Sequence, residues 1–182
     1  RHVGPREVPP DRTELHQIAR DARDVTGDGV ADAAAGHPRA SAGAFRSGAV
    51  FVYPGTGSGL ADEPSIVLGG DRRDAEHGPA VELADLDGDG LTDLVVSAPA
   101  SSPTASGNGA VLVYHGTRDG LAQEPGTRFF GLAGGDRFGQ SLAVCDFDGD
   151  GRLDLAVGAP QAEDRSQSPV ANDQGGVFVF VA

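Results

Sequence analysis

The chain has 182 residues and a formal net charge of −13, and it contains 28 glycines and 12 prolines. A chain this acidic is not expected to bind nucleic acid, because it has no basic patch to collect phosphates. No apolar run approaches the roughly 18 residues of a membrane-spanning helix, so membrane insertion is not expected either.

Three nine-residue acidic loops follow one another, each beginning 61 residues after the one before. The first, "DVTGDGVAD", offers the side chains of Asp24, Thr26, Asp28 and Asp32 and the carbonyl of Val30. The second, "DLDGDGLTD", offers Asp85, Asp87, Asp89 and Asp93 and the carbonyl of Leu91. The third, "DFDGDGRLD", offers Asp146, Asp148, Asp150 and Asp154 and the carbonyl of Arg152.

The spacing of these oxygens predicts a calcium site in each loop. Alternate side chains point inward, a glycine permits the sharp turn, and a ligand set made only of oxygen favours a hard cation such as Ca²⁺. A bound cation would also offset the repulsion among carboxylates held this close together. We therefore expect up to three Ca²⁺ ions with a structural role. The first site should be the weakest, because Thr26 supplies a neutral hydroxyl.

Two other interpretations of the loops are an EF-hand and a turn that binds nothing. An EF-hand needs a glutamate at the twelfth position and a helix on each side. The twelfth positions here are Ala35, Val96 and Val157, and the flanks alternate as strands do. An empty acidic turn would explain one loop, since Asp and Gly are common turn residues. It does not explain the same loop at a fixed spacing.

Around the loops, the sequence predicts short strands. The segments "VELAD" and "SLAVCD" lead into a loop, and "DLVVSAP" and "DLAVGAP" lead out. The β-branched runs "AVFVY", "AVLVY" and "VFVFV" predict a third strand, and "PSIVLGG" and "TRFFGL" a fourth, with a "GT…GL" turn between them. Four antiparallel strands in about 60 residues are typical of one β-propeller blade, so the expected class is all-β. The single cysteine, Cys145, is expected to be a small buried residue.

The segment "DRFGQSLAVCDFDGDGRLDLAVGAP" resembles an FG-GAP repeat of the integrin α-subunit propeller. Phe138-Gly139 matches the "FG" and Gly158-Ala159-Pro160 the "GAP". The corresponding residues are His77-Gly78 and Ser97-Ala98-Pro99 in the second repeat, and His16-Gln17 and Gly36-His37-Pro38 in the first. We expect a terminal segment at 1–12, repeats at 13–70 and 71–131, and an incomplete third repeat at 132–182.

The resemblance implies calcium hairpins on one face of a propeller and ligands or partner subunits on the opposite face. That opposite face would carry the loops 37–48, 98–109 and 160–175. Arg39, Phe45 and Arg46 are candidate ligand contacts in the first of these loops. Three blades do not close a ring. We therefore expect a piece of a longer propeller, or a homo-oligomer that completes one, with residues 1–10 as a candidate closing strand.

Two classes of function fit these features. The first is a calcium-stabilised binding or adhesion module for a protein or glycan ligand, secreted or at the cell surface, because extracellular calcium fills sites of modest affinity. The second is the propeller of a secreted hydrolase or polysaccharide lyase, as the resemblance also implies. The sequence shows no catalytic constellation, so the first class is preferred. The Ala-, Gly-, Asp- and Arg-rich composition indicates a bacterial gene.

Overall fold

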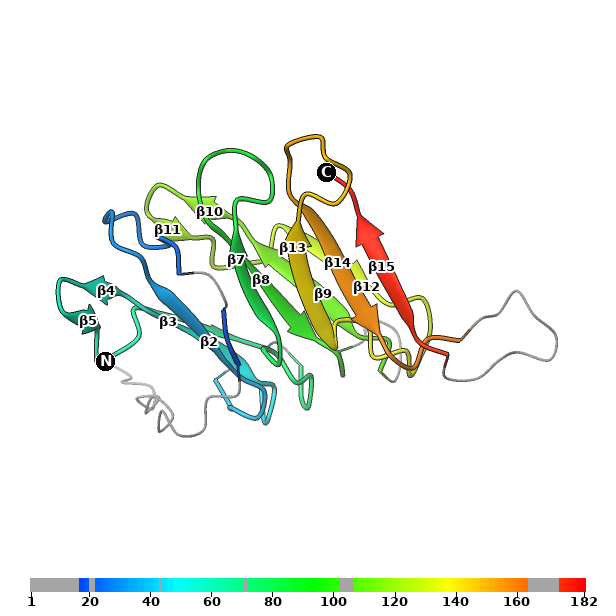
Figure 1. The fold of residues 1–182 in the computed structure, drawn as a ribbon. Helices are drawn as coiled ribbons and strands as arrows, with labels where there is room; N and C mark the ends of the chain where they lie inside the picture. Colours follow the sequence, from blue (N-terminus) through cyan, green and yellow to red (C-terminus); the bar gives the residue numbers. More distant parts are fainter. Residues whose placement is uncertain (1–16, 20–21, 43, 71, 102–106, 164–173) are drawn as a thin grey trace.

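The computed structural model describes residues 17–182 except 20–21, 43, 71, 102–106 and 164–173. Within those residues the protein is all-β, without a helix, and its main strands form three antiparallel sheets that stand beside one another (Figure 1). The predicted fold class is therefore confirmed, with three blades that form a partial, open propeller. No helix in the described ranges is long and apolar enough to cross a membrane.

The strands follow the repeat. The first sheet contains, in spatial order, β1 (Gln17–Ile18), β2 (Ala33–His37), β3 (Ala49–Tyr53) and β6 (Ile66–Gly69). The second contains β12 (Thr127–Phe130), β9 (Ala110–Tyr114), β8 (Asp93–Ala98) and β7 (Val81–Ala84). The third contains β13 (Ser141–Cys145), β14 (Asp154–Ala159) and β15 (Gly176–Phe180). Two ribbons, β4–β5 (Gly55–Thr56, Gly59–Leu60) and β10–β11 (Gly116–Thr117, Gly120–Leu121), occupy the predicted "GT…GL" turns.

The second sheet is covered on both faces. Side chains alternate across a strand, so Leu94 and Val96 of β8 belong to the core shared with the first sheet, whereas Val95 belongs to the core shared with the third. All six residues of β8 are buried. A strand packed on two faces needs an apolar residue at nearly every position, which explains the continuous run "DLVVSA".

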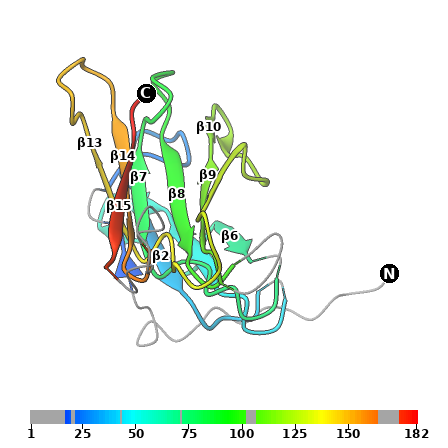
Figure 2. The same ribbon diagram turned by 90° about the vertical axis from the view of Figure 1, so that its right-hand side faces the viewer.

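Within the described residues, the third sheet has one covered face. Phe178 and Phe180 of β15 pack toward the second sheet, whereas Val177 and Val179 point outward and are 72% and 51% exposed. Cys145 lies on the same outward face and is exposed, so the expectation that it is buried was wrong. Its apolar neighbours suggested a core position, but no described layer covers this face of the sheet (Figure 2).

Neighbouring repeats interlock where the third strand of one meets the "FG" position of the next. Gly48 and Gly109 precede β3 and β9 with φ of 81° and 84°. A Cβ at these glycines would lie 2.3 Å from the His77 carbonyl oxygen and 2.0 Å from that of Phe138. Only glycine satisfies both the backbone conformation and the close approach. His77 and Phe138, which occupy the same repeat position, are both buried, at 1% exposed each.

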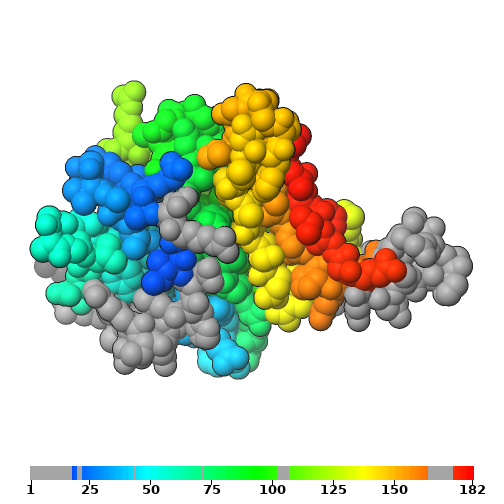
Figure 3. Space-filling view, viewed as in Figure 1, coloured from blue at the N-terminus to red at the C-terminus, as the bar shows by residue number. Residues whose placement is uncertain are grey.

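The acidic loops and the 37–48 loop lie at opposite ends of the sheets. All three acidic loops gather at the upper end in Figure 1, whereas the turn between β2 and β3 lies at the lower end. Figure 3 shows the second and third acidic loops next to each other on the surface. Both line one hollow, through Asp85, Asp87 and Arg152.

Candidate metal centres

The two glycines of each loop set its shape. In the second loop, Gly88 and Gly90 have φ of 76° and 86°, and the glycines at the same places in the other loops are also left-handed. Residues with a Cβ are strained in this region, so the pattern Asp-x-Asp-Gly-Asp-Gly selects this turn. The turn brings the first and sixth positions together. The Gly90 nitrogen donates to Asp85 Oδ2 at 3.0 Å, and the Gly151 nitrogen donates to Asp146 Oδ2 at 2.9 Å.

The ninth aspartate of each loop is buried and ties the loop to the sheet. Asp32, Asp93 and Asp154 are no more than 1% exposed. One carboxylate oxygen accepts from a backbone nitrogen at the start of its own loop: Val25, Leu86 and Phe147 donate at 2.9, 3.0 and 2.9 Å. The other accepts from a nitrogen beyond the third strand: Gly55, Gly116 and Ala182 donate at 2.8, 2.8 and 3.0 Å. The aspartate spacing predicts these residues only as ligands, whereas the structure shows that they also hold the loop to the sheet.

The second loop has the donor arrangement of a cation site. Ligand oxygens of Asp85, Asp87 and Asp89 lie within 4.8 Å of one another. Asp85 Oδ1 is buried and has no hydrogen-bond partner among the described residues. A buried carboxylate oxygen without a partner is costly unless a positive charge faces it. The residues of this loop therefore fit a divalent cation.

In the third loop, the carboxylates that lie close together are at other positions of the motif than in the second loop. Asp146, Asp148 and Asp154 form the close group. Asp150 Oδ2 instead accepts hydrogen bonds from Arg152 Nη2 at 2.6 Å and Nε at 3.0 Å. The Arg152 guanidinium lowers the pKa of the Asp150 carboxyl by this hydrogen bond. The guanidinium thus occupies a carboxylate that was predicted to bind metal.

The first loop shows no group of three metal-ligating side chains among its described residues. Both oxygens of Asp24 accept backbone hydrogen bonds, from Gly27 at 2.7 Å and Gly29 at 2.7 Å. Thr26 Oγ1 is buried and has no described hydrogen-bond partner. One neutral oxygen thus stands where the other loops place a carboxylate.

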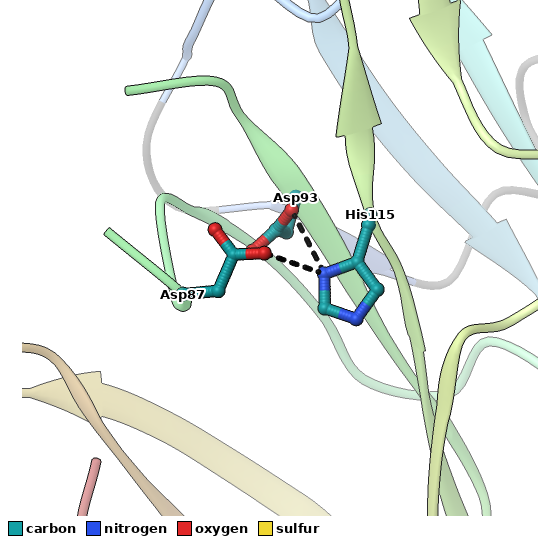
Figure 4. Close-up of side chains that lie close together, drawn as sticks. All are labelled: Asp87, Asp93 and His115. Atoms are coloured by element: carbon teal, nitrogen blue, oxygen red, sulfur yellow. Dashed lines mark ion pairs between the residues drawn. The ribbon is translucent and has the colours of Figure 1, made fainter. Parts of the chain in front are cut away.

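A second group at the second loop includes a histidine that sequence analysis did not assign. Ligand atoms of Asp87, Asp93 and His115 lie within 4.8 Å of one another. Figure 4 shows the His115 ring, just beyond β9, with Nδ1 directed at both carboxylates. His115 is hard to recognise as a ligand from the sequence because it stands 22 residues after Asp93, outside the motif.

The candidate ligand contacts Arg39, Phe45 and Arg46 belong to the 37–48 loop, at the end of the sheets opposite the acidic loops (Figure 1). Phe45 is 58% exposed, and the Arg73 guanidinium lies 4.8 Å from its ring centroid. Arg46 Nε lies 3.8 Å from Asp74 Oδ1, and Arg39 is exposed. Two of the three candidates thus contact the 72–74 segment.

Comparisons with known proteins identify the repeat family of this chain. The family profile described as "FG-GAP repeat" matches residues 77–114 and 138–180, and one described as "FG-GAP-like repeat" matches 100–157. Integrin alpha-PS5 of Drosophila melanogaster is 35% identical over 151 residues, which is 78% of this chain and 14% of the relative. Integrin alpha-4 of Xenopus laevis is 44% identical over 117 residues, 62% of this chain and 10% of the relative.

A relative of another kind is the phosphatidylinositol-glycan-specific phospholipase D of Mus musculus. It is 34% identical over 150 residues, which is 76% of this chain and 18% of the relative. The chain thus spans only a small part of the length of each of these relatives. The shared part is the repeat.

Proposed function

Because the chain belongs to the FG-GAP repeat proteins, similar to integrin α subunits, we propose that it is a calcium-braced β-propeller module that binds a partner and has no catalysis of its own. The acidic loops would hold up to three Ca²⁺ ions at one end of the blades. The partner would bind at the other end of the blades, where β2, β8 and β14 end and β3, β9 and β15 begin (Figure 1).

One observation supports the calcium role above the others: Asp85 Oδ1, beside Asp87 and Asp89, is buried and has no hydrogen-bond partner among the residues that the structure describes. In this loop, Asp85, Asp87 and Asp89 would hold the ion. A bound Ca²⁺ supplies positive charge that neutralises the carboxylates. Since Asp93 already links the loop to the backbone of Gly116, a braced loop would stiffen the whole upper end of the second blade.

Calcium titration by isothermal calorimetry tests this proposal, with thermal unfolding in Ca²⁺ and in chelator as a second measurement. The variants are Asp87→Asn and Asp148→Asn, and Asp119→Asn is the control because it makes the same charge change at an exposed position outside the loops. We expect each loop variant to lose one bound Ca²⁺, and the control to lose none. Chelation should lower the melting temperature, because a ligand that binds only the native state stabilises it. The absence of any bound Ca²⁺ would refute the proposal.

A protein partner is favoured over a glycan because two of the relatives are integrins and because the lower end presents the exposed Phe45. Arg39 and Arg46 would add positive charge there to an otherwise acidic protein. Binding screens against extracellular proteins and glycan arrays separate the two ligand classes. Phe45→Ala should abolish the protein signal without changing Ca²⁺ binding.

An enzymatic role is the second candidate, and the phospholipase relative is the observation that favours it. In that case the chain would be the propeller of a larger secreted enzyme. Incubating the purified chain with a phosphatidylinositol glycan, and with polysaccharides, tests for turnover. Cleavage that a single acid or base variant abolishes would favour this candidate.

The calcium role also bears on location and assembly. Loops that bind Ca²⁺ with modest affinity are filled at extracellular concentrations, so we place the protein outside the cell. The outward face of the third sheet, with Val177 and Val179, would be covered by a further blade or by another copy of the chain. Light scattering of the chain distinguishes these states. The bacterial origin and the closing role of residues 1–10 stay predictions, and those residues lie outside the described ones.

A further inference from the structure

The second repeat carries a group of nitrogen and oxygen ligand atoms that has no equivalent among the described residues of the other two repeats. We propose that His115, Asp87 and Asp93 form a site for a first-row transition metal ion of the Zn²⁺ type. This inference rests on the proposed role of the second loop in binding cations. It makes that loop chemically different from the other two.

The geometry around His115 Nδ1 points to a shared cation. Nδ1 lies 3.2 Å from Asp87 Oδ2 and 3.4 Å from Asp93 Oδ1 (Figure 4). The nitrogen is buried and makes no hydrogen bond within the described part of the chain, so neither carboxylate is aligned to accept from it. Ligand atoms around a tetrahedral Zn²⁺ with bonds of about 2.1 Å stand about 3.4 Å apart. The observed separations match that spacing.

The histidine ring is held by residues that leave Nδ1 available. Nε2 lies 3.3 Å from Thr127 Oγ1, and metal-binding histidines commonly use the other ring nitrogen for such a hydrogen bond. Gly126 makes room for the ring, because a Cβ there would lie 2.5 Å from His115 Cδ2. Asp93 is 1% exposed, and its Oδ1, the oxygen that faces Nδ1, also accepts a hydrogen bond from the Gly116 nitrogen at 2.8 Å. Two of the three ligands are therefore already positioned.

The other repeats cannot build this site. The strand register places Pro54 in the first repeat and Val181 in the third where the second has His115. The residue that contacts the histidine ring differs as well. In the first repeat, Ile66 of β6 occupies the position that Thr127 of β12 occupies in the second. Calcium favours oxygen ligands, whereas an imidazole nitrogen beside carboxylates suits zinc and its neighbours. Only the second loop offers that combination among the described residues.

Zinc binding to the full chain tests the inference. Equilibrium dialysis against ZnCl₂ and against CaCl₂ is run on the wild type, on His115→Val, and on Asp148→Asn. Valine is the residue that the third repeat carries at this place, and Asp148 is the matched aspartate of the third loop. We expect His115→Val to weaken Zn²⁺ binding at the second loop at least about tenfold, since even loss of an outer partner costs that much. Its Ca²⁺ binding should change less than about threefold, and Asp148→Asn should leave the His115-dependent Zn²⁺ binding intact.

A second measurement does not depend on the variant folding. In the wild type, the proton resonances of the His115 ring should shift on addition of Zn²⁺ and reach a limit at one equivalent. Unchanged ring resonances would overturn the inference. So would a His115→Val protein that binds both Zn²⁺ and Ca²⁺ more tightly, because His115 would then act as a built-in positive charge that the metal must displace. If no loop binds Ca²⁺ either, the proposed function fails; if Ca²⁺ binds normally, only this inference fails.

Discussion

The second and third acidic loops differ at three of nine positions, yet they present their carboxylates in different groups. The second gathers Asp85, Asp87 and Asp89, whereas the third gathers Asp146, Asp148 and Asp154. The loops also differ in the side chains other than aspartate that contact them. His115 approaches the second loop from beyond β9, and Arg152 binds Asp150 within the third. The aspartate spacing determines which oxygens are available, and neighbouring side chains determine where they point.

The sheets that carry the two loops differ in the same way. The second sheet is packed between two neighbours, whereas the third has one packed face within the described structure. Side chains on the two faces of β15 should therefore differ sharply in what they contribute to stability.

The largest loss of stability is expected at the interface between the second and third sheets. Phe138 is 1% exposed and its ring lies 5.4 Å from that of Phe178 and 6.2 Å from that of Phe180. Phe138→Ala should lower the free energy of unfolding by about 3–5 kcal/mol, the usual cost of removing a buried phenylalanine. Val179→Ala, on the outward face, should cost under about 1 kcal/mol. Urea denaturation measures both. Equal losses would mean that the outward face is covered in solution.

The next largest effect is expected at the buried ninth aspartate. Asp93→Ala would leave the backbone nitrogens of Leu86 and Gly116 without their acceptor. Both hydrogen bonds are part-buried, and an unsatisfied buried donor costs about 1–3 kcal/mol, so we expect a loss of about 2–4 kcal/mol for the two together without any metal present. Asp154→Ala should cost less, because both of its donors, Phe147 and Ala182, lie in exposed residues.

Chemical denaturation in chelator measures both variants, with Asp119→Ala as the surface control. A variant that loses stability only when Ca²⁺ is present would contradict the structural role. Asp93 would then act only as a ligand.

The sequence predicted the parts of this molecule that repeat. The loops, their strands and the blade class follow from motifs that recur every 61 residues, such as "GDG" with its left-handed glycines. The missed features depend on contacts between distant segments. The hydrogen bond from the Gly116 nitrogen to Asp93 spans 23 residues, and His115 has no histidine counterpart in the other repeats. Cys145 was misjudged because an apolar strand does not reveal which of its faces has a neighbour.

A smaller effect should separate the first aspartates of the two loops. Asp85 has a buried oxygen without a described partner, whereas both oxygens of Asp146 accept backbone hydrogen bonds, from Gly149 at 2.6 Å and Gly151 at 2.9 Å. Asp85→Asn should weaken Ca²⁺ binding at the second loop about tenfold, because it removes charge from the oxygen that most needs a cation. Asp146→Asn should weaken the third loop less. Calorimetric titration of the two variants compares them directly, and the reverse order would contradict the assignment.

The smallest effect is expected from Arg152. Its guanidinium holds Asp150 Oδ2 and would have to release that oxygen before Asp150 could face a cation. Arg152→Leu installs the residue found at the same place in the second loop, Leu91, and should tighten Ca²⁺ binding at the third loop about two- to fivefold. The gain should be small because the ion pair is exposed and screened by water.

Calorimetry at low and high salt measures the change, and the difference between the proteins should shrink as salt screens the guanidinium. The reciprocal variant Leu91→Arg should weaken the second loop by a similar factor. If Arg152→Leu instead weakens binding, the arginine orients Asp150 for the metal. The two loops would then reach the same ligand geometry by different routes.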